Sequence, residues 1–171
     1  MSDPGDSRSW AAPDLPENLA GGVIHDILTF PDPVLRENCA SAGYLTGTEL
    51  IQLAADLLAT MYASGGCGLA APQIGVMRRI FVMDAGWKDG ESRPIVMLDP
   101  EILAVSDARS PMREDCLSFP VEEIESLRPD HIEIAWYDLI GLYHRETLSH
   151  RAAGIAQHQT DHLDGRLIID L

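Results

Sequence analysis

The predicted helix near the C-terminal end of the sequence places the strongest constraint on the fold. It begins near Ser149, a suitable N-cap, and runs to about Leu163, and Asp164-Gly165 follows as a stop signal. His158 and His162 lie four residues apart within it, so both imidazoles project from the same face. Two such imidazoles can bind one metal ion without any movement of the backbone. We therefore expect the fold to bring further metal ligands to this face.

A third protein ligand is expected from upstream of the histidines. Only Asp164 and Asp170 follow His162 as further candidates. Cys116 is the natural upstream choice because a thiolate binds iron or zinc well. A catalytic site would leave one position open for water, whereas a structural site would fill it, for example with Asp161 or Asp164. Both kinds of site stay open on the residues alone.

Composition favours one compact domain behind a flexible extension. The chain has 171 residues and is 46% hydrophobic, which is enough for a core of ordinary size. Residues 1–22 are rich in Pro, Asp, Ser and Gly and are expected to be flexible, and residues 23–171 are expected to form the domain. We see no run of the ~20 apolar residues that span a membrane. The N-terminus does not look like a secretory signal, so a cytoplasmic location is expected.

Charge and cysteine content narrow the possible partners and setting. Acidic residues outnumber basic ones by 27 to 12, for a net charge of -15, which argues against nucleic acid or an anionic membrane as the main partner. The three cysteines are few, odd in number and far apart, which favours a reduced setting without disulfides. Cys39 and Cys67 are interpreted as small buried side chains.

The remaining elements are predicted to be one more long helix and several short strands. The helix spans Thr48–Ser64, with Thr48 as its N-cap and Gly65-Gly66 as its stop. Residues 27–38 are expected to give a strand end, a proline-containing turn and a short helix. The other strands are predicted at Arg79–Met83, Ile95–Leu98, Ile132–Tyr137, Tyr143–Leu148 (antiparallel to the preceding one) and Leu167–Ile169. Strands between two terminal helices indicate an α+β fold.

Three motifs in a fixed order resemble those of the peptide deformylases. The first is Gly66-Cys67-Gly68-Leu69-Ala70-Ala71-Pro72-Gln73, the second is Glu114-Asp115-Cys116-Leu117-Ser118, and the third is Gln157-His158-Gln159-Thr160-Asp161-His162. Residues 30–36 and Arg128-Pro129 also match, so the resemblance covers about residue 23 to the C-terminus. It implies short antiparallel or mixed sheets packed around the C-terminal helix that carries the two histidines.

The resemblance also implies roles for individual residues. Cys116, His158 and His162 would bind one divalent metal ion, most often Fe²⁺ in the family, with Zn²⁺ or Ni²⁺ as alternatives. Water activated by the metal would remove the formyl group from the formyl-methionine of nascent peptides. Two groups would stabilise the developing oxyanion, the backbone N–H of Leu117 and the side-chain amide of Gln73. The substrate peptide would add as a strand to Gly66, Cys67 and Gly68.

Position 159 departs from the family, in which a glutamate moves the proton during catalysis. Gln159 is nearly the same size, so metal binding should survive, but an amide cannot accept and return a proton. General acid–base catalysis is worth roughly 10²–10⁴ in rate, so we expect strongly reduced activity. The alternative is a silenced paralogue that binds formylated or acylated peptides without turnover.

Other departures lie around the same site. Asp115 replaces a glycine, which would suit a backbone with positive φ. His150-Arg151-Ala152 replaces Gly-Leu-Leu, and Gly154 stands where a bulkier apolar residue is usual. In relatives these positions help to line the pocket for the methionine side chain. Several differences around one site favour natural divergence over a deliberate single substitution that would trap substrate.

Overall fold

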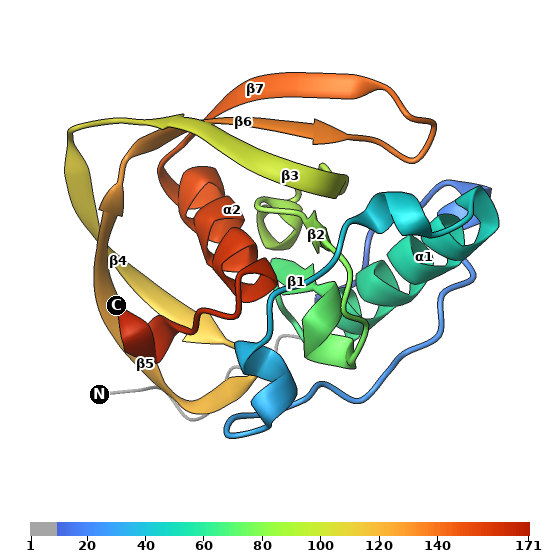
Figure 1. The fold of residues 1–171 in the computed structure, drawn as a ribbon, viewed down its shortest axis with the longest axis horizontal. Helices are drawn as coiled ribbons and strands as arrows, with labels where there is room; N and C mark the ends of the chain where they lie inside the picture. The colour runs from blue at the N-terminus through green and yellow to red at the C-terminus, as the bar shows by residue number, and fades with distance from the viewer. Residues whose placement is uncertain (1–9) are drawn as a thin grey trace.

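The computed structural model describes residues 10–171, in which seven strands form two sheets (Figure 1). The larger sheet is antiparallel, in the order β1-β2-β3-β6-β7, and β4 and β5 form a separate hairpin. The strands are β1 (Gly68–Ala70), β2 (Ile80–Met83), β3 (Ile95–Val105), β4 (Arg109–Cys116), β5 (Phe119–Pro129), β6 (His131–Tyr137) and β7 (Tyr143–Ser149). The α+β fold expected from the sequence is confirmed.

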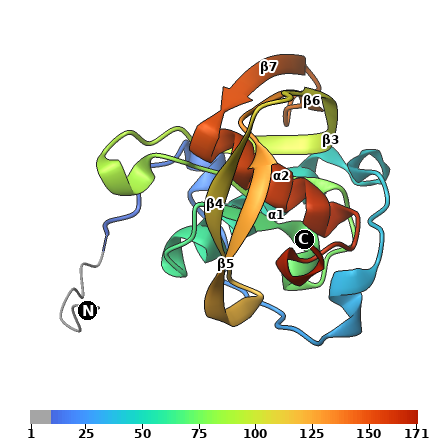
Figure 2. The same cartoon turned by 90° about the vertical axis from the view of Figure 1, so that its left-hand side faces the viewer.

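Two α-helices pack on this framework, together with short 3₁₀ turns. α1 spans Gly47–Ala63 and α2 spans His150–Leu163. The 3₁₀ turns are η1 (Glu17–Leu19), η2 (Pro33–Arg36), η3 (Ala42–Tyr44), η4 (Ala71–Ile74), η5 (Trp87–Asp89) and η6 (Ile168–Asp170). α2 lies in the middle of the molecule, and the β4–β5 hairpin crosses in front of it in the second view (Figures 1 and 2). The predicted metal-binding helix is therefore enclosed by both sheets.

β2 separates the two halves of the hydrophobic core. Its side chains alternate between faces, as the pleat of a strand requires. Phe81 and Met83 pack in the cluster on the α2 side, while Ile80 and Val82 pack in the cluster on the α1 side. All four are buried because each face of the strand is covered by a helix. This packing fixes α2 and β1, which is paired with β2, relative to each other.

Helix ends and short segments account for the incorrect predictions. α1 begins two residues earlier than a Thr48 N-cap would place it, because Thr46 and Glu49 form a reciprocal capping box. The predicted strand at Leu167–Ile169 is wrong: η6 forms instead, with the Asp170 carboxylate accepting from the Leu167 N–H. The strand end predicted at the start of residues 27–38 is also wrong, since no strand forms there.

The segment before the domain is only partly described. Within residues 10–22, η1 packs against α1, and the Trp10 and Trp87 rings meet edge to face at 6.4 Å. Residues 1–9 lie outside the described part of the chain. The flexibility and the boundary predicted for residues 1–22 stay predictions. Among the described helices, none is long and apolar enough to cross a membrane.

Candidate metal centre

Cys116, His158 and His162 come together in the interior. α2 carries the histidines on one face, and Cys116 is the last residue of β4, at the tight turn into β5. The His162 Nε2 lies 3.2 Å from the Cys116 Sγ and also 3.2 Å from the His158 Nε2. All three side chains are buried. The structure thus brings together the three predicted ligands, while their role in metal binding remains a prediction.

The arrangement fits a divalent transition metal. Ligand atoms bound at about 2.0–2.3 Å to one tetrahedral ion lie roughly 3.3–3.6 Å from one another. The separations of 3.2 Å are close to this value. Burial lowers the pKa of His162, which favours the neutral imidazole that binds metals. One thiolate and two imidazoles suit Fe²⁺, Zn²⁺ or Ni²⁺.

Glu114 forms a hydrogen bond with the His158 ring nitrogen that points away from the cluster. The His158 Nδ1 lies 2.9 Å from the Glu114 Oε1, so an Nδ1–H can donate to the carboxylate and leave Nε2 free to bind a metal. Arg128 donates to both Glu114 oxygens, at 2.7 and 2.8 Å, and Ser126 donates to one of them. Burial alone would raise the pKa of Glu114, but these hydrogen bonds hold it at about 2.

Sequence reasoning gave Glu114 and Arg128 no role. A usable signal was the period of the strand, because Glu114 and Cys116 are two apart and both buried on the same face of β4. Neither the hairpin nor the buried arginine that neutralises Glu114 was predicted. The β4–β5 pairing brings Arg128 to Glu114, although the two are 14 residues apart.

Gln159 lies beside the cluster with an unused hydrogen-bonding group. Its side chain is only 5% exposed, and its Oε1 finds no hydrogen-bond partner among the described residues. A buried acceptor without a partner costs about 1–3 kcal/mol, so this oxygen is suited to a bound molecule. A Cβ on Gly68 would lie 2.6 Å from the Gln159 Nε2, so the glycine leaves room for this amide.

The two predicted oxyanion groups also lie near the cluster. Gln73 is 1% exposed, and its Nε2 donates to the Ser118 Oγ at 3.0 Å and lies 3.8 Å from the Cys116 Sγ. Its Oε1 accepts from the Ala70 N–H at 2.9 Å, which fixes the direction of the amide. Leu117 follows Cys116 directly, in the turn between β4 and β5. The geometry is compatible with the roles predicted for both, which stay predictions.

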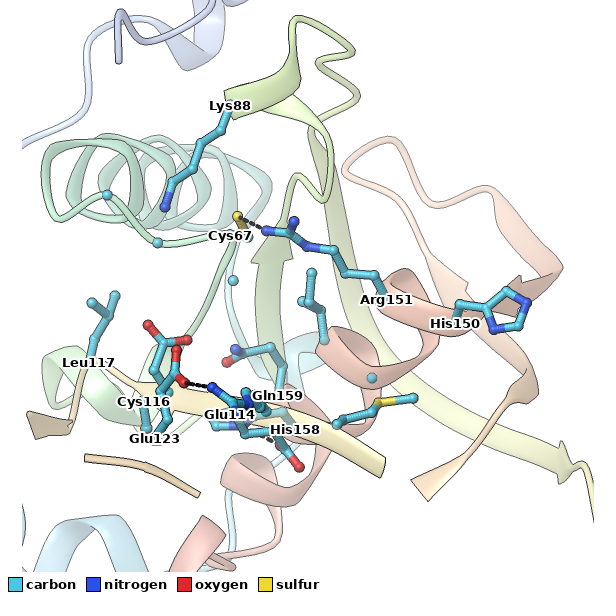
Figure 3. Close-up of a pocket in the computed structure, with 18 of the residues that line it drawn as sticks. Cys67, Lys88, Glu114, Cys116, Leu117, Glu123, His150, Arg151, His158 and Gln159 are labelled. Atoms are coloured by element: carbon cyan, nitrogen blue, oxygen red, sulfur yellow. Dashed lines mark hydrogen bonds and ion pairs between the residues drawn. The ribbon is translucent and has the colours of Figure 1, made fainter. Parts of the chain in front are cut away.

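A cavity of about 610 Å³ opens beside the cluster (Figure 3). Gly66, Cys67 and Gly68 line it, together with Gln73, Cys116, His158 and Gln159. Gly68 begins β1, which is an edge strand of the five-stranded sheet. One side of β1 therefore has no partner strand in this sheet. An extended peptide can add to such an edge by backbone hydrogen bonds.

Two of the sequence-based alternatives find no support in the contacts. Asp161 and Asp164 were possible fourth ligands of a closed site, but Asp161 pairs with Arg128 at 3.1 Å and Asp164 with Arg79 at 2.9 Å. Asp115 does not adopt a positive φ, so the special tolerance of aspartate is not needed there. Among the residues that line the cavity, His150 has a positive φ, of 51°.

Comparison with known proteins decides the family. The model of the family described as polypeptide deformylase matches residues 24–171. The chain belongs to this family. A peptide deformylase of Maricaulis maris is 41% identical over 148 residues, which cover 86% of this chain and 84% of that protein. Family membership indicates a metal-binding hydrolase.

Solved structures of peptide deformylases share the fold. The crystal structure of the Thermotoga maritima protein superposes with a TM-score of 0.80 at 37% identity, and the match covers 86% of this chain and 97% of that chain. A class I type b peptide deformylase of Acinetobacter baumannii, solved with Met-Ala-Ser bound, gives a TM-score of 0.79 at 30% identity, with 86% and 98% covered. The packing of both sheets around α2 is thus shared with these solved structures.

Proposed function

We propose that this chain binds N-formyl peptides at the Cys116–His158–His162 cluster and hydrolyses the formyl amide slowly. The reference substrate is formyl-methionine at the start of a nascent peptide, in the cytoplasm, with Fe²⁺ as the expected metal and Zn²⁺ or Ni²⁺ as alternatives. The main observation in support of this proposal is that the three predicted ligand atoms converge beside the cavity and the free edge of β1. The relative solved with Met-Ala-Ser bound supports a peptide as the ligand.

The reaction adds water across the formyl C–N bond. The oxygen of water joins the formyl carbon, the C–N bond breaks, and the products are formate and a peptide with a free amine that has gained a proton. A bound divalent ion supplies Lewis acidity, which polarises the carbonyl and lowers the pKa of water. The N–H of Leu117 and the amide N–H of Gln73 would stabilise negative charge on the formyl oxygen.

Gln159 limits the rate in this proposal. Its buried amide can orient water or the peptide N–H through hydrogen bonds, but it cannot carry the proton from water to the leaving amine. That proton must then pass through solvent. The second candidate function follows from the same residue: a protein that retains the pocket and captures formyl peptides without turnover. It is favoured by the unpartnered Oε1 of Gln159, which is available to a ligand.

Formate release and binding, measured on one metal-loaded preparation, test the proposal. A formyl-Met peptide and a metal-chelating hydroxamate should both bind, and the peptide should release formate slowly. Cys116→Ala should abolish metal loading and formate release. Tight binding with no formate above the Cys116→Ala background would favour the capture function. Failure of both ligands to bind would contradict both functions.

A further inference from the structure

The cavity has one cationic end. Lys88, from η5, and Arg151, from the first turn of α2, both line it, and their side chains point toward Cys67 in the close-up (Figure 3). The Arg151 Nη2 lies 3.3 Å from the Cys67 Sγ. In a chain with 12 basic and 27 acidic residues, two cations at one end of one cavity are unusual.

Neither cation is neutralised by a carboxylate within the described part of the chain. Arg151 has only the Cys67 thiol, a weak acceptor, as its hydrogen-bond partner there. The Lys88 Nζ stands 4.5 Å from the centroid of the Trp10 ring, a contact that leaves its hydrogens free to donate. Both side chains can therefore bind an anionic ligand.

The carboxylates that line the cavity belong to its other side. Glu114, Asp115 and Glu123 all come from the β4–β5 hairpin. Glu114 is bound to Arg128, and Glu123 lies 3.7 Å from Arg113. Figure 3 shows Glu114 and Glu123 beside Cys116, away from Arg151 and Lys88. The cationic end is thus left available to a ligand rather than neutralised by its own walls.

The apolar part of the cavity is already partly filled. Gly154 of α2 is buried, and a Cβ at this position would lie 2.6 Å from the Met112 Sδ. The Met112 thioether therefore packs directly on the backbone of the helix. An unbranched apolar substrate side chain such as methionine would compete with the Met112 side chain for the apolar surface at Gly154.

We infer that the cavity selects N-formyl peptides that carry a carboxylate on the first side chain, with Arg151 as the specificity-determining residue and Lys88 as the second cation. This inference rests on the proposed function and narrows its substrate from formyl-methionine to a formyl-acidic residue. The guanidinium of Arg151 can bind a carboxylate with two parallel hydrogen bonds, which the Cys67 thiol cannot match.

Equilibrium binding to the full-length, metal-loaded protein tests this selectivity without requiring turnover. The probes are three C-terminally amidated formyl tripeptides that differ only in the first residue: glutamate, glutamine or methionine. We expect the glutamate peptide to bind roughly five- to twentyfold more tightly than the glutamine peptide, as for one charge-assisted hydrogen bond in a partly exposed pocket. Arg151→Gln should remove this preference and Lys88→Met should reduce it.

Arg145→Gln provides the matched control, because it removes the same charge from an exposed arginine of β7 that pairs with Glu133 on the neighbouring β6. The Arg145→Gln protein should keep the same preference for the glutamate peptide over the glutamine peptide.

A second control uses formyl-Met dipeptides with a free or an amidated C-terminus, which distinguish recognition of a side-chain carboxylate from recognition of a terminal one. Equal binding of the glutamate and glutamine peptides would overturn the inference, and so would a stronger effect of the free C-terminus. If the methionine peptide still bound, the proposed function would stand. Failure of all the peptides to bind would overturn both.

Discussion

At the residue scale, the orientation of His158 depends on a buried carboxylate that binds no metal itself. Glu114 accepts from the imidazole with one oxygen and from Arg128 with both. Both side chains are over 90% buried, so each depends on the other for charge compensation. This explains why a carboxylate persists in the interior, and why the imidazole presents Nε2 to the cluster.

Replacement of Glu114 by alanine should therefore weaken both the fold and the metal site. We expect Glu114→Ala to lower the free energy of unfolding by about 3 kcal/mol or more, because the Arg128 charge is left in the interior with Asp161 alone. Metal affinity should fall by roughly 10–100-fold. Denaturant unfolding and chelator competition measure the two effects. Glu133→Ala, which removes a half-buried carboxylate paired with Arg145, is the control. An equal loss of stability in both variants would refute this role.

His150 and Asp99 share a positive φ, and the two should respond in opposite directions to glycine. The φ values are 51° and 48°. The His150 ring meets the His131 ring edge to face, whereas the Asp99 carboxylate accepts from the Ala42 N–H and the Ser41 hydroxyl at 2.9 Å each. His150→Gly should raise the free energy of unfolding by up to about 1 kcal/mol, since strain is relieved. Asp99→Gly should lower it by about 1 kcal/mol or more. Thermal unfolding of both variants tests this, and a destabilised His150→Gly would contradict it.

At the element scale, the free edge of β1 is the expected docking strand for the peptide. Gly68 faces α2, where an added Cβ would lie 2.6 Å from the Gln159 Nε2 and 2.9 Å from the Ile155 Cγ2. Gly68→Ala should displace Gln159 and weaken formyl-peptide binding by at least about tenfold, with little change in metal content. Gly47→Ala, at the start of α1 with open space around it, is the control. Unchanged peptide affinity in Gly68→Ala would exclude β1 as the docking strand.

The sequence predicted those elements whose signals are local. Helical periodicity located α1, and the cap and stop signals located α2. Alternation located β6, with β7 as its antiparallel partner. The β4–β5 hairpin was not predicted, because its sequence is rich in charged residues, which are uncommon in strands. The same limit applies to the site. The convergence of Cys116, His158 and His162 was predicted from spacing and motif. The support of His158 by Glu114 and the cationic end of the cavity required the three-dimensional arrangement.

At the scale of the whole molecule, the metal should hold the two sheets together. Cys116 belongs to the hairpin, and the histidines belong to the helix that packs on the larger sheet. Metal at 100 times its dissociation constant should raise the free energy of unfolding by about 2.7 kcal/mol. For a chain of this size that is roughly 5–10 °C in Tm. Chelation should reverse the shift, and His162→Ala should abolish it. A Tm that does not respond to metal would argue against the centre.

The central claim is that the chain keeps a deformylase centre whose rate is limited by the amide at position 159. The most direct test is the ratio of formate-release rates between Gln159→Glu and the parent chain, at equal metal content and with the same formyl peptide. We predict a ratio of roughly 10²–10⁴ in favour of Gln159→Glu, the usual contribution of a general acid–base group. A ratio near one, with both proteins fully metal-loaded, would contradict the account.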